Sequence, residues 1–336
     1  MMARSSTPRS PTPRTIDDWL AHLKTLDLPR DADELRRVLA LERPGAGVAI
    51  AAVARRAAEH SLHAFAPELA AAFTRLVADA KRDPGCRGKN AIARCLHDLD
   101  VWEEAVFAAG ATLVQLEGPL SEITGKQDDM AAELRGICAL AYARFLRPDA
   151  LDVIADLLVD EWAVTRIAAA RALGACGRYD ATALLRYKLL AVDDEPEVLA
   201  ACCDSLLELS RDASPFLIKL LSNHDDRAEA AALALGGARI SDARDALIEW
   251  CTACSPDRRH RAGYVVLALL RDDVANAFLA EAIAKRAKAD ALAAARALAT
   301  FNDHEPTREL LATAIASVKD TAVRRELGKL IADQNS

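Results

Sequence analysis

Residues 168–177, AAARALGACG, carry the pattern that decides the fold. Aligned with four later segments, they place a leucine in the same register each time, at Leu173, Leu207, Leu235, Leu269 and Leu298. The intervals are 34, 28, 34 and 29 residues, and Leu327, Leu140 and Leu96 extend the series in both directions. Each interval accommodates two short helices and a turn, and such units bury their apolar faces by stacking. The sequence therefore predicts an all-α chain, an α-solenoid of about eight antiparallel helix pairs.

The composition agrees with stacked helices. Hydrophobic residues make up 52% of the 336-residue chain and aromatic residues only 4%, so alanine and leucine dominate the apolar content. Both are strong helix formers. No run of alternating β-branched residues indicates a strand, and we expect no β-sheet. Prolines precede several apolar periodic runs, at the first-turn position where a missing N–H is tolerated, and so mark helix starts: Pro148, Pro196, Pro215, Pro256 and Pro306.

The chain is predicted to have a short tail and one folded array. Residues 1–14, MMARSSTPRSPTPR, form a basic Pro/Ser-rich segment that cannot bury an apolar face, and we expect it to be disordered. Order is expected to begin at Thr15, which can cap a helix with Asp18 three residues on. Residues 15–333 then form a single solenoid, with divergent helical pairs over 15–129 and more regular repeats over 130–333.

Residues 160–190, DEWAVTRIAAARALGACGRYDATALLRYKLL, resemble a HEAT repeat of the kind also found in phycobilin-lyase-like proteins. Residues 193–210, DDEPEVLAACCDSLLELS, resemble a second copy. The resemblance covers about residues 130–333, implies a HEAT/armadillo-like superhelix, and carries no catalytic motif. Thr165 stands where the repeat's arginine is expected, with Arg166 shifted by one. In the first part, GCRGKNAIARCL, VQLEG and AAELRGICAL together resemble an uncharacterised bacterial HEAT-repeat group, which implies no known activity.

Charge and apolar content restrict the partners. The net charge is −7, and because Arg4, Arg9 and Arg14 contribute +3, the remaining residues carry −10. This balance argues against a general nucleic-acid binder, which normally presents a large basic face. No apolar run approaches the length of a membrane span, and no secretory signal is evident. We expect a cytoplasmic monomer without cofactor or metal, in which the eight cysteines are small buried hydrophobes.

The segment DPGCRGKNAIARCL, residues 83–96, runs from a glycine-rich loop through Gly-Lys into a helical pattern, as a phosphate-binding loop does. Such a loop needs four residues between its first glycine and Gly-Lys, followed by Ser or Thr. Here Gly85 and Gly88 enclose two residues and Asn90 follows Lys89, so the pattern does not predict nucleotide hydrolysis. Two interpretations remain: a turn that joins two helices, or an anion site formed by Arg87 and Lys89 beside a helix N-terminus.

The long connection at residues 116–130 lies among polar residues within otherwise apolar surroundings. These polar residues and the cations of residues 83–96 form the predicted binding site. We expect a mixed-charge pocket for a partner's carboxylate or phosphate, lined by Arg87, Lys89, Gln115, Glu117, Glu133 and Arg135. The alternative for this group is helix capping and hydrogen bonding between repeats, as is usual for buried polar side chains.

Two further patterns are ambiguous. Cys251 and Cys254 form a lone Cys-x-x-Cys with His260 nearby, but a zinc site needs four converging ligands, so we expect core thiols. His60 and His63 lie one turn apart beside Glu59, which fits half a metal site or a solvated helix face.

The function predicted from these features is that of a non-catalytic scaffold or adaptor, which binds a protein or peptide on the concave surface of the solenoid. The resemblance to phycobilin-lyase-like repeats suggests an alternative, a lyase-like or chaperone protein acting on a pigment-binding partner. A second alternative is a HEAT-like DNA-base glycosylase, for which Trp102 with Glu103 and Trp162 with Glu161 supply the residue types.

Overall fold

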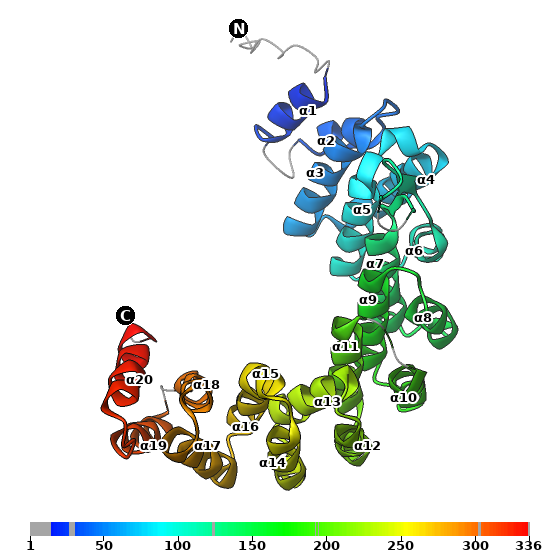
Figure 1. Cartoon of the computed structure of the whole chain (residues 1–336). Coiled ribbons are helices and arrows are strands. Elements are labelled where there is room, and N and C mark those ends of the chain that lie inside the picture. The colour runs from blue at the N-terminus through cyan, green and yellow to red at the C-terminus, as the bar shows by residue number, and fades with distance from the viewer. Residues whose placement is uncertain are drawn as a thin grey trace, which may run out of the picture. The chain divides into compact units, whose positions relative to one another are not determined.

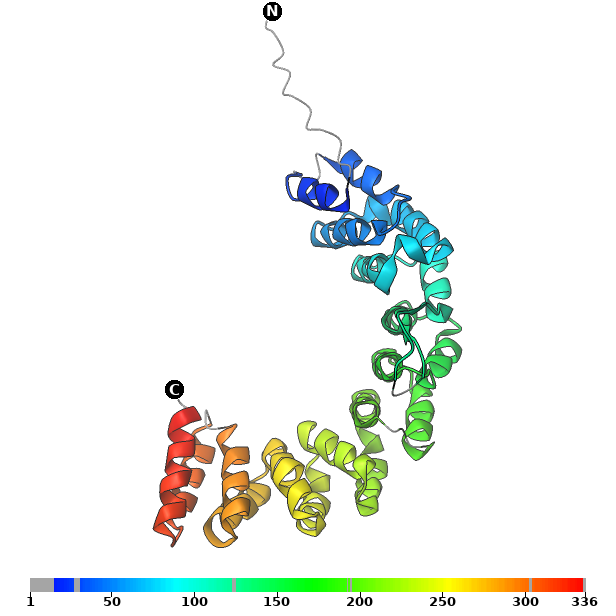
Figure 2. The same ribbon diagram turned by 45° about the horizontal axis from the view of Figure 1, so that its top comes forward.

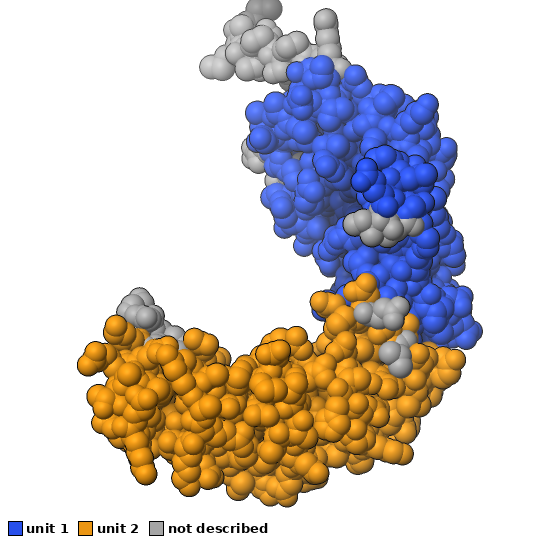
Figure 3. All heavy atoms as spheres, in the orientation of Figure 1, with its two compact units in different colours: residues 1–172 blue, residues 173–336 orange. Residues whose placement is uncertain are grey.

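The computed structural model describes residues 15–26, 31–122, 125–191, 193, 195–301 and 304–334. The chain divides into two compact units, residues 1–172 and 173–336, which are coloured separately in Figure 3. The predicted disorder of residues 1–14 lies outside the described residues.

The first unit consists of helix pairs arranged in two rows (Figure 1). One row contains α1 (Ile16–Leu23), α3 (Ala46–Glu59), α5 (Arg87–Asp98) and α7 (Ala132–Arg144). The other contains α2 (Ala32–Leu39), α4 (Ala66–Ala78), α6 (Glu104–Thr112) and α8 (Ala150–Leu158). The helix α9 (Ala163–Ala175) follows and packs on α7, where Gly136 lies against Ala168.

The second unit repeats this arrangement, and its helices stand side by side in succession in Figure 2. One row contains α11 (Pro196–Leu209), α13 (Asp226–Gly237), α16 (Tyr264–Leu270), α18 (Lys288–Ala299) and α20 (Thr321–Gln334). The other contains α10 (Ala181–Ala191), α12 (Ser214–Leu220), α14 (Arg244–Ala253), α17 (Asp273–Lys285) and α19 (Glu305–Ala316). The short α15 (Pro256–Arg258) and a π-helical turn (Arg259–Gly263) lead into α16. The predicted α-solenoid of antiparallel helix pairs is confirmed.

Short 3-10 turns join the helices, at His63–Phe65, Ala80–Arg82, Pro84–Cys86, Arg211–Ala213, Leu221–Asn223 and Ser241–Ala243. The prediction of no β-sheet is wrong in one detail. The strands β1 (Leu116–Glu117) and β2 (Asp128–Asp129) pair antiparallel and close the long connection into a hairpin. Two residue pairs suffice because a carboxylate reinforces them: Asp129 Oδ1 accepts the backbone N–H of Gln115 at 2.9 Å.

Local signals place five helix starts where the sequence predicts them. Thr15 and Asp18 form a reciprocal capping box at the start of α1. Four of the five marker prolines lie in the first turn of a helix, in α11, α12, α15 and α19. Pro148 instead precedes Asp149, which is the N-cap residue of α8. Among the described residues, no helix is both long and apolar enough to cross a bilayer.

Helix ends carry a second repeated signal, a left-handed residue after the last turn. After α3, α5, α7, α9, α13 and α16 these residues are, in order, Ser61, Asp100, Leu146, Gly177, Arg239 and Arg271. At four of them the following N–H bonds to the carbonyl five residues earlier, at Ala57, Leu96, Tyr142 and Leu235, which defines a Schellman motif. The residue four positions before each left-handed residue is buried. In two repeats this buried position differs by two residues from the predicted leucine register. Tyr142 is buried there in place of Leu140, and Leu267 in place of Leu269.

Candidate functional site

The segment DPGCRGKN is a tight turn that holds two helices close together. Gly85 adopts φ 69° within the turn, and α5 begins directly after it. Gly88 faces α3 and α4. A Cβ added to Gly88 would lie 2.9 Å from the Cα of Gly47 on α3 and 2.7 Å from the Cδ1 of Leu76 on α4. The second glycine of the motif therefore serves helix packing, and no phosphate is needed to explain it.

Asp83 occupies the N-terminus of α5. Its carboxylate accepts the backbone N–H groups of Gly88 at 2.8 Å and Lys89 at 2.9 Å. The same carboxylate pairs with Lys89 Nζ at 3.1 Å, and both side chains are fully buried. Because these N–H groups and the ammonium are already bonded, the predicted anion site at this helix start is not available. Lys89 is a structural cation here, and it is not part of an open anion site as one interpretation of the sequence predicted.

The hairpin β1–β2 fastens this turn to the following repeat. Glu117 in β1 accepts the N–H of Gly85 at 3.0 Å. Gln115 donates from Nε2 to the carbonyl of Asp83 at 3.0 Å and to Glu117 at 2.5 Å. Gln115 and Glu117 therefore hold the turn in place, as in the structural alternative to the predicted pocket.

Arg135 on α7 continues the buried network into the next repeat. Its guanidinium pairs with Asp129 at 2.6 Å and with Asp160 at 2.7 Å, and it donates to the carbonyl of Leu113 at 2.7 Å. The residue is 5% exposed. Like Lys89, Arg135 is thus saturated by carboxylates of its own chain, so it is not free to hold a partner's carboxylate or phosphate as predicted.

The buried network changes the pKa of the Asp129 carboxyl group. Burial acts to raise the pKa of its carboxyl group, but three interactions outweigh burial: the N–H of Gln115, the Arg135 guanidinium and the N–H of Ala131. The pKa of Asp129 therefore lies below its ordinary value. Sequence reasoning missed Asp83, Asp129 and Asp160, although each stands in a polar turn directly before a helix, a position that favours carboxylates.

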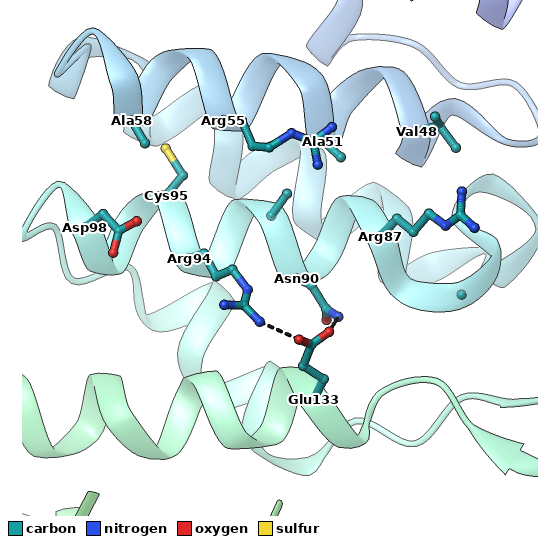
Figure 4. A pocket seen from close by; sticks show the side chains of 12 residues that line it. Val48, Ala51, Arg55, Ala58, Arg87, Asn90, Arg94, Cys95, Asp98 and Glu133 are labelled. Atoms are coloured by element: carbon teal, nitrogen blue, oxygen red, sulfur yellow. Dashed lines mark hydrogen bonds and ion pairs between the residues drawn. The ribbon is translucent and has the colours of Figure 1, made fainter. Parts of the chain in front are cut away.

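Arg87 and Glu133, the two other predicted residues, line an open pocket between α3, α5 and α7 (Figure 4). The pocket has a volume of about 450 Å³. Glu133 reaches from α7 to α5, where it accepts from Asn90 Nδ2 at 2.6 Å and from Arg94. The sequence did not single out three residues that share this pocket: Arg55, Asn90 and Arg94.

Two cations in the pocket have no carboxylate partner among the described residues. Arg55 extends from α3 and Arg87 from the first turn of α5, and both are exposed. By contrast, Arg94 pairs with Glu133. The predicted group of six residues therefore separates into a structural part, which is Lys89, Gln115, Glu117 and Arg135, and an open part, which is Arg87 and Glu133. Of these six, Arg87 has the unpaired guanidinium, and Arg55 joins it in the pocket.

The other candidate residues have structural surroundings. All eight cysteines are free and buried, and burial raises the pKa of the Cys202 thiol to about 12. His63 turns its Nδ1 toward the carbonyl of Ser61 at 2.7 Å. No group of three or more metal-ligating side chains occurs within the described ranges.

Trp102 lies in an aromatic cluster. Its ring stacks on Phe107 with a centroid distance of 5.1 Å, meets Tyr142 and Phe145 edge-on, and is covered by the Arg147 guanidinium at 4.8 Å. These neighbours occupy the ring faces that a nucleobase would need for stacking.

Comparisons with known proteins give similarity only in solved structures. No family model matches the chain, and no curated protein matches it. The chain is similar to the complex of CpcE and CpcF of phycocyanin lyase from Nostoc sp. PCC7120, with 20% identity, coverage of 65% of this chain and 98% of that chain, and a TM-score of 0.34. Human deoxyhypusine hydroxylase in complex with glycerol matches with 20% identity, coverage of 79% and 95%, and a TM-score of 0.31. At this level neither similarity indicates an activity for this chain.

Proposed function

We propose that the chain is a non-catalytic scaffold that binds a protein or peptide partner, and that the pocket between α3, α5 and α7 is part of its binding surface. The observation that carries this proposal is the pair of exposed arginines, Arg55 and Arg87, which line one pocket without a carboxylate partner in the described part of the chain. Exposed guanidinium groups gain most from a partner's carboxylate, because they can form two parallel hydrogen bonds with it.

The surroundings of these arginines support binding over catalysis. Cys95 is the one thiol in the pocket lining, and burial raises its pKa to about 12, so it is protonated at neutral pH and is a poor nucleophile. The pocket lies on one row of helices, where neighbouring repeats can extend a contact surface. Such surfaces recognise partners through area and charge complementarity.

Site-specific crosslinking in the native cell tests this function. A photoreactive amino acid replaces Val48, which lines the pocket, in the full chain. We expect it to capture one specific partner, and the Arg55→Gln, Arg87→Gln double variant to lose that product. As a matched control, Arg171→Gln changes an exposed arginine of α9 outside the pocket and should leave the product unchanged.

A second placement controls for random contacts. The photoreactive group at Tyr179, which is 74% exposed in the other unit, should give a different set of products. Identical products from both positions, or a product from position 48 that survives the double arginine variant, would contradict the proposed binding surface.

A further inference from the structure

The pocket between α3, α5 and α7 contains an unpaired acceptor beside its unpaired cations. Asn90 lines the pocket, and its buried Oδ1 has no hydrogen-bond donor among the described residues. The amide orientation is fixed by Glu133, because a carboxylate only accepts and must therefore face Nδ2. A ligand that satisfies this pocket needs an anionic group for the arginines and an N–H donor for Asn90.

We propose that the pocket recognises an extended acidic peptide segment, with side-chain carboxylates bound by Arg55 and Arg87 and a backbone N–H donated to Asn90 Oδ1. This inference rests on the proposed function and specifies the chemistry of the partner. A peptide combines both groups within one residue, since each non-proline residue has a backbone N–H next to its side chain. Satisfying a buried acceptor adds to affinity, because an unbonded one costs free energy in the complex.

The shape of the pocket fits a peptide backbone. Its apolar residues are small, with Ala51, Ala58 and Ala91 contributed by the two facing helices α3 and α5. Small side chains let a backbone approach the helices closely, whereas a large aromatic anchor finds little apolar surface there. The contact therefore depends on hydrogen bonds and charge.

A nucleic-acid backbone fits the same pocket less well. Phosphate groups accept hydrogen bonds but donate none, so they leave Asn90 Oδ1 unsatisfied. The carboxylates of Glu133 and Asp98 also line the pocket and repel phosphates and peptide carboxylates alike. The N–H donors of the peptide backbone are therefore what distinguishes the two ligands.

Fluorescence anisotropy of the full chain with a labelled octapeptide of alternating aspartate and alanine tests the inference. The Arg55→Gln, Arg87→Gln double variant should bind about tenfold more weakly, and Asn90→Ala about fivefold more weakly, as expected for two lost ion pairs and one lost hydrogen bond. Arg171→Gln should bind like the unaltered chain. Circular dichroism and urea unfolding of each variant show that the fold is retained.

A series of octapeptides, each N-methylated at one backbone position, tests the hydrogen bond to Asn90. One of them should lose about fivefold in affinity for the unaltered chain, while Asn90→Ala should bind it as well as the unmethylated peptide. This coupling distinguishes recognition of a backbone N–H from a structural effect of Asn90.

Two outcomes would overturn the inference. If binding depends on both arginines but is insensitive to N-methylation and to Asn90→Ala, the peptide-binding function stands while the backbone recognition fails. If the acidic peptide does not bind, or a single-stranded oligothymidylate displaces it at equal concentration, the acidic-peptide chemistry fails. The crosslink from position 48 remains an independent test of the proposed function in both cases.

Discussion

At the scale of single residues, the pair Asp83–Lys89 explains the Gly-Lys segment without any ligand. Both side chains are fully buried, and Lys89 Nζ also lies 3.4 Å from the carbonyl of Leu76. Asp83 in turn caps α5 with both carboxylate oxygens. A buried charge of this kind depends on its partner, because an uncompensated charge in the interior is strongly unfavourable.

We predict that Lys89→Met lowers the free energy of unfolding by about 3–5 kcal/mol, since it leaves the Asp83 carboxylate buried without its counterion. Urea unfolding at neutral pH measures this. Lys219→Met, a change in the exposed lysine of α12, serves as the control and should stay within about 0.5 kcal/mol. A loss below about 1 kcal/mol for Lys89→Met would indicate that Lys89 is not needed to balance Asp83.

Asp129 makes stability depend on pH. The pKa of Asp129 is lower in the folded chain than in the unfolded chain. Its charge therefore contributes fully to the free energy of unfolding above the ordinary aspartate pKa near 4, and this contribution is lost as the pH falls toward the pKa of the folded chain. We therefore predict that Asp129→Asn destabilises the chain at pH 7 and that the difference from the unaltered chain shrinks below about pH 4. Urea midpoints measured from pH 7 to pH 3 test this; a constant difference would contradict the role of the carboxylate charge.

At the scale of elements, the distance between helices is controlled by glycine. An added Cβ at Gly47 would lie 2.8 Å or less from three side-chain atoms of Asp83, so any other residue there would displace the carboxylate that caps α5. Gly88 meets Gly47 from the other side. The two glycines thus allow α3 and α5, two of the helices that line the candidate pocket, to approach each other.

Gly88→Ala is predicted to cost about 1–3 kcal/mol of stability, because the added methyl group overlaps Leu76 and the backbone of Gly47. Gly237→Ala is a matched control at the end of α13, where no atom lies within 4 Å of the added Cβ. That change should be neutral or slightly stabilising, since alanine favours helices. Thermal unfolding of both variants compares them, and equal effects would show that Gly88 is not a packing glycine.

At the scale of the whole molecule, helices contact mainly their own pair and the adjacent pairs. In the second unit α19 packs on α17 and α18, and α20 packs on α18 and α19. Stability in such an array is a sum over neighbouring contacts, so the terminal pair can be removed without dismantling a central core.

We predict that a chain ending at residue 302 stays soluble and helical, without α19 and α20. Its far-ultraviolet circular dichroism per molecule should fall in proportion to the helical residues removed, and its unfolding midpoint should fall moderately because the face of α18 loses its cover. A loss of nearly all helical signal in the truncated chain would instead indicate one closed core.

Much of the fold follows from local sequence signals. The leucine register, the capping box at Thr15 and the first-turn prolines are properties of short segments, and a helix start depends on residues within one turn of it. For this reason the helix pairs and the helix starts marked by Thr15 and by four prolines could be predicted from the sequence. The burial of the cysteines could be predicted as well, because it follows from their apolar surroundings.

The candidate site depended on the tertiary structure. Arg135 is saturated by Asp160, which lies 25 residues away in the chain, and only the packing of successive repeats brings them together. The same packing buries Lys89 against Asp83 and leaves Arg55 and Arg87 exposed in one pocket. Helical periodicity tells which face of a helix is polar, but it does not tell which carboxylate reaches which cation. For Arg135 and Asp160 that choice requires atoms from separate repeats to lie within about 3 Å of each other, and no local pattern encodes such a distance.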